Sequence, residues 1–206
     1  MAHLSAKPDE DRPVRLGVFG GTFDPPHIGH VLLTKELQAS TALDEILWIP
    51  ARVPPHKPVD GPTSPELRLE MACAATKGLD HHDVSNVELQ RPGPSYTVDT
   101  LRTVRAECPS TVPVLIMGSD QFAELEDWHE AAELVALAEV CVLARDGVDV
   151  GAVAPGLDVV WSTADVSAVD VSSSDIRERV REGRPYKHLV PAAVAEIIER
   201  ESLYIE

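Results

Sequence analysis

The stretch Gly20–His30 reads Gly-Gly-Thr-Phe-Asp-Pro-Pro-His-Ile-Gly-His and follows directly on the apolar run Arg15–Phe19. Two adjacent glycines at a strand end allow a backbone turn that brings N–H groups close to an anion, where a Cβ atom would interfere. The two prolines delay the start of a helix to about His27. His27 and His30 then share one face of the first helical turn, where free N–H groups favour phosphate. This stretch therefore predicts a nucleotide-binding turn between a strand and a helix.

Other phosphate-binding and catalytic motifs do not fit the spacing of this stretch. The sequence contains no Gly-x-x-x-x-Gly-Lys-Ser/Thr, and Gly17, Gly20 and Gly21 do not give the Gly-x-Gly-x-x-Gly of a dinucleotide fold. Two helical histidines three residues apart also differ from a zinc pair, whose ligands usually lie four apart with a third ligand nearby. A structural turn with two packed histidines stays open as the simpler alternative.

The charge of the chain limits its partners. The sequence has 18 Lys and Arg residues against 34 Asp and Glu residues, a formal net charge of −16. Such a charge disfavours binding to nucleic acid or to an anionic membrane, so a phosphate site has to be a local exception. No apolar run is long enough for a transmembrane helix. We therefore predict neither a nucleic-acid nor a membrane partner, while a homo-oligomer stays open.

A chain of 206 residues is long enough to fold as one domain without disulfides or a structural metal. We expect a flexible polar leader over residues 1–13 and a single domain over residues 14–206. The odd number and wide separation of the cysteines favour small buried residues in a reducing, cytoplasmic protein. They are Cys73, Cys108 and Cys141.

Short apolar runs alternate with helical patterns along the whole chain. The predicted strands are Arg15–Phe19, Glu45–Pro50, Val84–Val87, Val114–Gly118, Val140–Ala144 and Leu157–Trp161. The predicted helices are Ile28–Ser40, Pro65–Lys77, Thr97–Ala106, Ala131–Ala138, Ser173–Glu182 and Pro191–Glu201. This alternation predicts an α/β fold, a Rossmann-like open parallel sheet with helices on both faces. Ligands of such sheets bind beyond the carboxyl ends of the strands, where the glycine turn lies.

The Gly20–His30 stretch resembles the signature of the His-x-Gly-His nucleotidyltransferases. Further segments are similar to the bacterial nicotinate mononucleotide adenylyltransferase family, in the same order and over residues 15–204: Pro54–Lys57, Ser95–Leu101, Gly118–Asp120 with Trp128 downstream, Val171–Arg177 and the tail Val190–Tyr204. Ser174 stands where that family often has threonine, which keeps the hydroxyl. The resemblance implies a nucleotidyltransferase-type fold with a small helical part over about 171–206. It also implies the reaction of ATP with nicotinate mononucleotide, which gives deamido-NAD and pyrophosphate.

Adenylyl transfer needs donors more than a base, because the attacking phosphate is already an anion. His27 and His30, as donors or imidazolium ions, are predicted to meet the α- and β-phosphates. Lys57, on the proline-rich loop Ala51–Ser64, is predicted to close over them. Arg177 is predicted to bind the β- and γ-phosphates, although by itself its segment fits an ordinary serine-capped helix. Mg²⁺ is expected to bind through ATP phosphates and water, without protein ligands. The predicted ATP-binding residues are Gly20, Gly21, Thr22, Phe23, Gly29, Gly118, Asp120, Ser172, Ser173 and Ser174.

The predicted binding site for the mononucleotide acceptor is built around one tryptophan and the start of one helix. Trp128 is predicted to stack on the nicotinate ring, and Tyr96 and Thr97 to donate hydrogen bonds to the mononucleotide. A packed role for Trp128, or a capping role for Thr97, stays open. The predicted mononucleotide-binding residues are Asp24, His56, Tyr96, Thr97 and Trp128. Arg68 and Met71 are expected to support the proline-rich loop, and three histidines are expected at the surface: His81, His82 and His129.

Two other functions compete with this interpretation. An adenylyltransferase of the same fold could use another acceptor, such as nicotinamide mononucleotide. A nucleotide-binding regulator without catalysis is the alternative of a different class, but it would require the loss of a phosphate ligand, and the predicted ligands are all present. An aminoacyl-tRNA synthetase is disfavoured because the chain lacks a Lys-Met-Ser-Lys-Ser loop and a basic surface.

Overall fold

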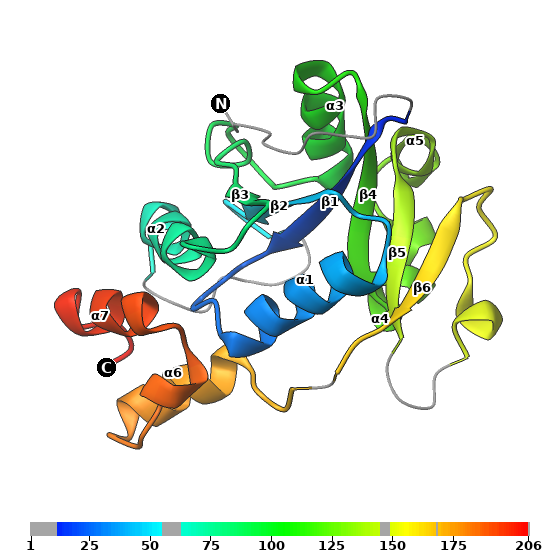
Figure 1. Cartoon of the computed structure of the whole chain (residues 1–206). Coiled ribbons are helices and arrows are strands. Elements are labelled where there is room, and N and C mark those ends of the chain that lie inside the picture. The colour runs from blue at the N-terminus through cyan, green and yellow to red at the C-terminus, as the bar shows by residue number, and fades with distance from the viewer. Residues whose placement is uncertain (1–11, 55–62, 145–148, 168, 206) are drawn as a thin grey trace.

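A parallel sheet places the predicted nucleotide turn at its carboxyl edge. The computed structural model describes residues 12–54, 63–144, 149–167 and 169–205. Within these residues, six parallel strands form one sheet in the order β3-β2-β1-β4-β5-β6 (Figure 1). The strands are β1 (Val14–Gly21), β2 (Glu45–Pro50), β3 (His82–Val84), β4 (Thr111–Gly118), β5 (Glu139–Ala144) and β6 (Trp161–Asp165). Because the strand order reverses between β1 and β4, the turn after β1 lies at the topological switch point.

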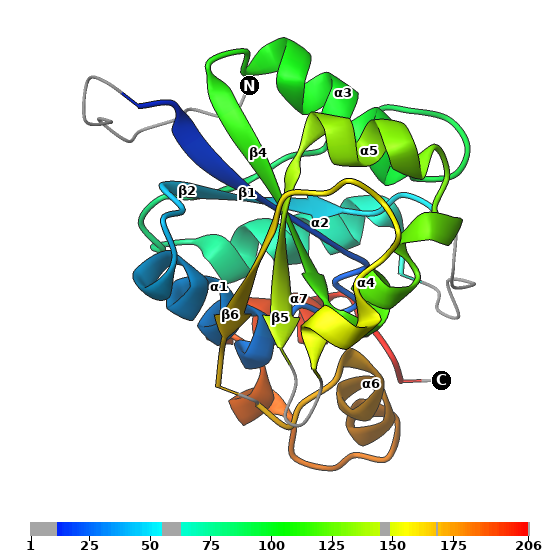
Figure 2. The same cartoon turned by 90° about the vertical axis from the view of Figure 1, so that its right-hand side faces the viewer.

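Helices cover both faces of the sheet, which confirms the predicted fold class. They are α1 (Ile28–Ser40), α2 (Pro65–Thr76), α3 (Thr97–Glu107), α4 (Ser119–Ala123), α5 (Ala131–Leu137), α6 (Ser173–Arg181) and α7 (Ala192–Arg200). Short 3₁₀ turns are η1 (Leu125–Asp127), η2 (Val150–Val153) and η3 (Lys187–Leu189). Figure 2 shows α3 and α5 on one side of the sheet and α1 and α2 on the other. None of the helices in the described ranges is long and apolar enough to cross a membrane.

The core forms because the central strands are apolar on both faces. Every residue of β2 is buried, and Trp48 in its middle is fully enclosed. One cluster packs Val98 and Leu101 of α3 against one face of the sheet, and a second packs Leu37 of α1 against the other face. Continuous burial of this kind is typical of parallel strands with helices on both sides.

The C-terminal part packs against α2 and lies beyond the carboxyl end of β1 (Figure 1). Ile176 of α6 and Val194 and Ile198 of α7 form an apolar cluster with Met71 of α2. The start of α6 is capped by Ser172, whose side chain accepts a hydrogen bond from the N–H of Asp175. This packing brings the C-terminal part to the turn after β1.

Two of the predicted strands lie at the wrong place in the chain, and the strand expected at Val114–Gly118 begins earlier, at Thr111. The strand expected at Val84–Val87 is β3 at His82–Val84, and the one expected at Leu157–Trp161 is β6 at Trp161–Asp165. Both strands lie at the edges of the sheet, where one side of the strand lacks a neighbour and burial no longer selects an apolar run. Leu157 and Val159 instead pack onto the core from the segment before β6.

Some smaller predictions also need correction or lie outside the described residues. Cys141 is buried as expected, but Cys73 is exposed, and His82 is buried and hydrogen bonds to the carbonyl of Asp80. All three cysteines are free thiols. The predicted leader lies outside the described residues except for its last two, of which Arg12 pairs with Asp44.

Candidate functional site

The turn after β1 is held in one conformation by its own aromatic residue. Phe23 is buried and has a positive φ of 51°, and the bond between Asp24 and Pro25 is cis. A Cβ atom on Gly21 would come within 2.8 Å of the Phe23 ring, so the ring can fold back only over a glycine. The second glycine of the pair is therefore required by packing as well as by the open approach to an anion.

His27 and His30 form a stacked pair at the start of α1. Their ring centroids are 3.7 Å apart with an interplanar angle of 28°. The backbone N–H of His27 donates to Nδ1 of His30 at 3.2 Å. Because an accepting Nδ1 carries no proton, the neutral His30 ring holds its proton on Nε2, which becomes the donor. The local fold thus selects the tautomer of His30.

Burial keeps both imidazoles neutral at neutral pH. Burial lowers the pKa of His27 to about 4, and burial together with the neighbouring His27 lowers the pKa of His30 to about 3. Three aromatic residues surround His30, with ring centroids 5.3–6.2 Å away: Phe19, Phe23 and Trp48. Of the two forms considered from the sequence, the neutral donor is the one that this environment favours before an anion binds.

Gly29 lets the histidine pair approach the C-terminal part. A Cβ atom at this position would lie 3.0 Å from Nδ1 of His27 and 3.0 Å from Cγ1 of Val171. The Nδ1 atom of His27 is buried without a hydrogen-bond partner among the described residues. Of the three glycines in the predicted motif, Gly21 and Gly29 thus lie where a side chain would displace an aromatic ring or a histidine, whereas a Cβ atom on Gly20 would meet open space.

The start of α6 is bonded directly to the turn after β1. The Ser173 hydroxyl donates to the carbonyl of Pro25 at 2.8 Å. Arg177 donates from Nη1 to the carbonyl of Asp24 at 2.8 Å and from Nη2 to the Ser174 hydroxyl at 3.3 Å. The helix is capped by Ser172, as predicted for an ordinary serine-capped helix. The Arg177 guanidinium, however, is hydrogen bonded to the turn after β1. Two predicted phosphate-binding segments are therefore brought together across about 150 residues of chain.

Asp24 points into the protein. Its Oδ1 accepts a 2.6 Å hydrogen bond from the hydroxyl of Tyr204, and both residues are buried. Burial and then the Asp24 charge raise the pKa of Tyr204 above its usual value, so the phenol stays protonated and donates. Asp24 does not line the cavity described below. Its role in binding the mononucleotide stays a prediction.

Arg68 joins the turn after β1 to the loop after β2. This fully buried arginine of α2 donates to the carbonyl oxygens of Thr22 at 2.9 Å and Arg52 at 3.0 Å, and also to that of Ala51. Arg68 was predicted to support the proline-rich loop, and it does contact the described beginning of that loop at Ala51 and Arg52. Met71 packs instead in the C-terminal cluster.

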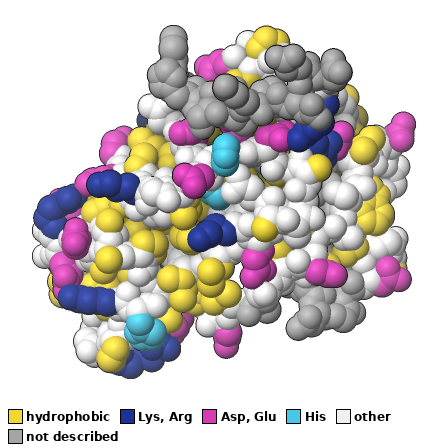
Figure 3. Space-filling model, viewed as in Figure 1, with side chains coloured by type: hydrophobic (Ala, Val, Ile, Leu, Met, Phe, Trp, Pro, Cys, Tyr) yellow, Lys and Arg dark blue, Asp and Glu magenta, His cyan; other side chains and the backbone are white. Residues whose placement is uncertain are grey.

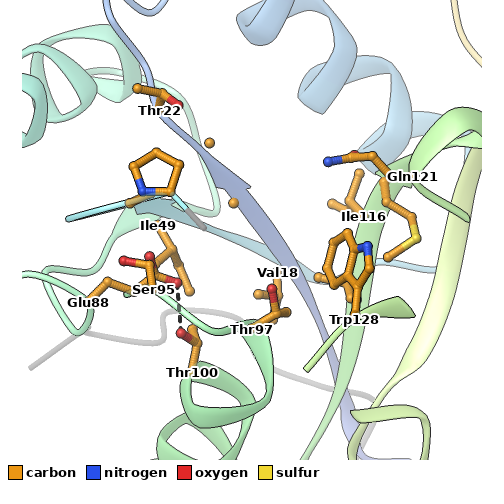
Figure 4. Close-up of a pocket in the computed structure, with 16 residues that line it drawn as sticks. Val18, Thr22, Ile49, Glu88, Ser95, Thr97, Thr100, Ile116, Gln121 and Trp128 are labelled. Atoms are coloured by element: carbon orange, nitrogen blue, oxygen red, sulfur yellow. Dashed lines mark hydrogen bonds between the residues drawn. The ribbon is translucent and has the colours of Figure 1, made fainter. Parts of the chain in front are cut away.

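A cavity of about 260 Å³ opens beside the carboxyl ends of β1, β2 and β4. The residues predicted from the sequence that line it are Gly20, Gly21, Thr22, Thr97 and Trp128. Figure 4 shows Trp128 on one side, Glu88, Ser95 and Thr100 on the other, and Thr97 between them. Apolar strand residues such as Ile49 and Ile116 complete the walls. A flat ring with polar substituents fits such a lining.

Other predicted residues are not among those that line the cavity, or they lie outside the described ranges. Tyr96, the residue before α3, stacks on His129 with ring centroids 4.1 Å apart. Asp120 is exposed in the first turn of α4, just after Gly118 at the end of β4. His56 and Lys57 lie outside the described residues.

Sequence reasoning missed a polar cluster on the cavity wall. Glu88 is buried, and its carboxylate accepts a 2.7 Å hydrogen bond from the Thr100 hydroxyl. Arg91 in turn donates to the Thr100 oxygen at 2.7 Å. A single glutamate in a turn has no spacing pattern that would mark it. The one available signal was its position seven residues before the Ser95–Leu101 segment.

Comparison with known proteins agrees with this geometry. The cytidylyltransferase-like family model matches residues 18–179, and the chain belongs to this family. Proteins from Geobacillus kaustophilus and Thermus thermophilus, each named "Probable nicotinate-nucleotide adenylyltransferase", are 40% and 41% identical to it. The alignments cover 92% of this chain and 86% of the first relative, and 93% of this chain and 100% of the second.

A solved structure shares the fold. The nicotinic acid mononucleotide adenylyltransferase of Plasmodium falciparum, in complex with NaAD, matches with a TM-score of 0.76 at 18% identity. The match covers 93% of this chain and 97% of that chain. Similarity at this level of identity establishes the architecture of the sheet and its helices.

Proposed function

We propose that this chain transfers the adenylyl group of ATP to nicotinate mononucleotide, forming deamido-NAD and pyrophosphate in NAD biosynthesis. One observation carries the proposal: three features lie together at the carboxyl end of β1. They are the neutral histidine pair, the serine-capped start of α6 and the cavity lined by Trp128. The names of the curated relatives support the same reaction.

The histidine pair suits a reaction that needs no general base. The phosphate of the mononucleotide attacks the α-phosphorus of ATP in line, and pyrophosphate leaves from the opposite side. A ring whose pKa is about 3 is a weak base, but its Nε2–H is a fixed donor. We assign His27 and His30 to donors that stabilise charge on the transferred phosphate. The N–H groups of the turn, Ser172–Ser174 and Arg177 are assigned to the remaining phosphates, with Lys57 as a further cation.

Mg²⁺ enters this proposal as part of the substrate. The described residues contain no group of three or more His, Cys, Asp or Glu side chains arranged to hold a metal ion. Mg²⁺ commonly binds through substrate phosphates and water rather than in a protein cage. We therefore assign the ion to the phosphates of MgATP, where it would neutralise charge on the leaving pyrophosphate.

The cavity is assigned to the nicotinate ring and its carboxylate. Trp128 offers a flat face for an electron-poor ring, and Thr97, which also lines the cavity, is assigned to donate to the carboxylate. A site built of donors accepts a carboxylate but leaves the NH₂ group of an amide without a partner. The acid is therefore expected to be the better acceptor. The cytoplasmic location stays a prediction.

Pyrophosphate release from MgATP with a panel of acceptors tests the proposal. Nicotinate mononucleotide should support turnover and yield deamido-NAD, with kcat/KM at least about a hundredfold above that for nicotinamide mononucleotide. Equal use of the amide would refute the acceptor assignment and leave adenylyl transfer intact. No adenylylated product with either mononucleotide, together with tight ATP binding, would support the regulator instead.

A further inference from the structure

The buried cluster around Glu88 connects three segments that surround the acceptor cavity. These are the loop after β2 at Arg52 and Val53, the turn that contains Glu88, and the start of α3. Glu88 is 7% exposed and lines the cavity. None of its contacts enters the reaction proposed above, so the cluster needs an explanation of its own.

The hydrogen bonds of Thr100 have a fixed direction. Its oxygen accepts from Nη2 of Arg91 at 2.7 Å, so its own proton is available for Oε1 of Glu88, also at 2.7 Å. The competing acceptor, the carbonyl of Tyr96, is farther away at 3.4 Å. A glutamine side chain has one acceptor oxygen where a carboxylate has two, so it could accept from Thr100 only by giving up any second hydroxyl that the carboxylate serves.

Ser95, two residues before α3, is also held by hydrogen bonds of fixed direction. Its oxygen accepts from the N–H groups of Arg52 at 3.0 Å and Val53 at 3.3 Å. The Ser95 side chain lies beside Glu88 in Figure 4, and its hydrogen bond to that carboxyl counteracts the rise in pKa that burial causes. The carboxylate thus stands between two hydroxyls that flank Tyr96 and Thr97.

A second set of bonds closes the cluster. The Arg52 guanidinium donates to the carbonyl of Arg91 at 2.8 Å and to that of Leu89 at 3.4 Å. The turn that holds Glu88 is thereby tied to the loop after β2, which in turn is tied to Ser95. Each of the three segments is bonded to both of the others.

We propose that Glu88 is a positioning residue for the acceptor, which fixes the start of α3 through Thr100 and Ser95 so that the donors of Thr97 face the cavity. This inference rests on the proposed function. Glu88 need not touch the mononucleotide, because it acts through the backbone that carries the donors. The buried carboxylate accepts hydrogen bonds from the Thr100 and Ser95 hydroxyls, whose oxygens in turn accept from other N–H groups. These bonds restrict the movement of the backbone at the start of α3.

Steady-state kinetics of Glu88→Gln and Thr100→Val test the inference. Each variant loses a buried hydrogen bond to a charged group, and we expect KM for nicotinate mononucleotide to rise at least about tenfold. KM for ATP and kcat should stay within about threefold of wild type. The double variant should show about the same KM as the worse single variant, because the one glutamine oxygen can then serve Ser95 and only the connection to Thr100 stays broken.

Two controls separate positioning from damage to the fold. Thr100→Ser keeps the hydroxyl and should stay within about twofold of wild type. Thr103 lies one turn further along α3 and donates to the carbonyl of Asp99 at 3.0 Å. Thr103→Val therefore removes a comparable hydroxyl from the same helix and should leave the acceptor KM unchanged. If Glu88→Gln does not fold, the Thr100→Val and Thr100→Ser pair carries the test.

The outcomes distinguish this inference from the function on which it rests. An active wild type whose Glu88→Gln and Thr100→Val variants keep the acceptor KM within twofold overturns the inference alone. Equal losses for ATP and the mononucleotide, or multiplicative effects in the double variant, overturn it as well. A wild type that forms no deamido-NAD overturns the proposed function and this inference together.

Discussion

Replacing Tyr204 with phenylalanine removes a single oxygen atom from the contact between the C-terminal end and the nucleotide turn. The hydroxyl donates to Asp24 at 2.6 Å, a distance typical of a hydrogen bond to a carboxylate. Each residue is 4% exposed, so water cannot replace the hydroxyl without a local opening. A hydrogen bond to a charged group contributes about 1.5–3 kcal/mol to stability. We expect Tyr204→Phe to lower the free energy of unfolding by that amount.

Urea unfolding at pH 7 measures this change as a shift in midpoint with an unchanged slope. For a chain of this size the same loss corresponds to a fall in Tm of about 3–12 °C. Tyr186, a half-buried tyrosine of the same C-terminal part, provides the control, and Tyr186→Phe should cost less than about 0.5 kcal/mol. A cycle with Asp24→Asn should show coupling of at least about 1 kcal/mol. A loss below about 0.5 kcal/mol for Tyr204→Phe would show that this contact does not hold the C-terminal part to the turn.

Three further predictions concern the histidine pair and Arg177. His30→Ala should lower kcat at least about a hundredfold with a smaller effect on the acceptor KM, because the donor acts mainly in the transition state; near wild-type turnover in a stopped assay would rule out this role. Arg177→Ala should weaken ATP binding by about 1.5–3 kcal/mol in a calorimetric titration, and an unchanged Kd would place the guanidinium outside the phosphate site. The pKa values of His27 and His30 in the folded protein, about 4 and about 3, lie below the unfolded value of 6.5. At pH values between the folded and unfolded pKa the unfolded chain binds more protons than the folded one. The free energy of unfolding therefore falls as the pH drops below 6.5. Each histidine should contribute a loss of about 1–2 kcal/mol between pH 6.5 and 5, and unfolding curves of a His27→Gln, His30→Gln variant that keep the full pH dependence would contradict the assignment.

The sequence predicted best those features that depend on neighbouring residues. The bounds of α1 and β2 agree with the structure, because proline, apolar runs and capping act within a few residues. The positions of the edge strands β3 and β6 were predicted wrongly, because the burial of an edge strand depends on which strand lies next to it in the sheet. The short helix α4 was missed, since five residues carry little periodic pattern.

The same distinction applies to the candidate site. The histidine motif could be recognised because its glycines, prolines and histidines all lie within the eleven-residue stretch Gly20–His30. The hydrogen bond from Tyr204 to Asp24 joins residues 180 positions apart, and the one from Thr100 to Glu88 joins residues 12 positions apart. No local sequence pattern predicts either bond. Buried polar partners of this kind become visible only when the fold brings them together.

The pairing of arginines explains how an acidic chain can build a site for two anions. Acidic and basic side chains are interspersed on the face shown in Figure 3, and surface arginines such as Arg102 and Arg200 bond to carboxylates. At the site, in contrast, the described hydrogen bonds of Arg68 and Arg177 go to carbonyl and hydroxyl oxygens. A guanidinium bonded to neutral oxygens keeps its full positive charge, while one bonded to a carboxylate is compensated. The net charge of −16 is spread over an exposed surface where salt screens it within about 10 Å. Beside the turn after β1 the Asp24 charge acts on Arg68, whereas the described hydrogen bonds of Arg177 go to neutral oxygens only. Arg177 is therefore the cation that we expect to favour phosphate there although the protein as a whole repels it.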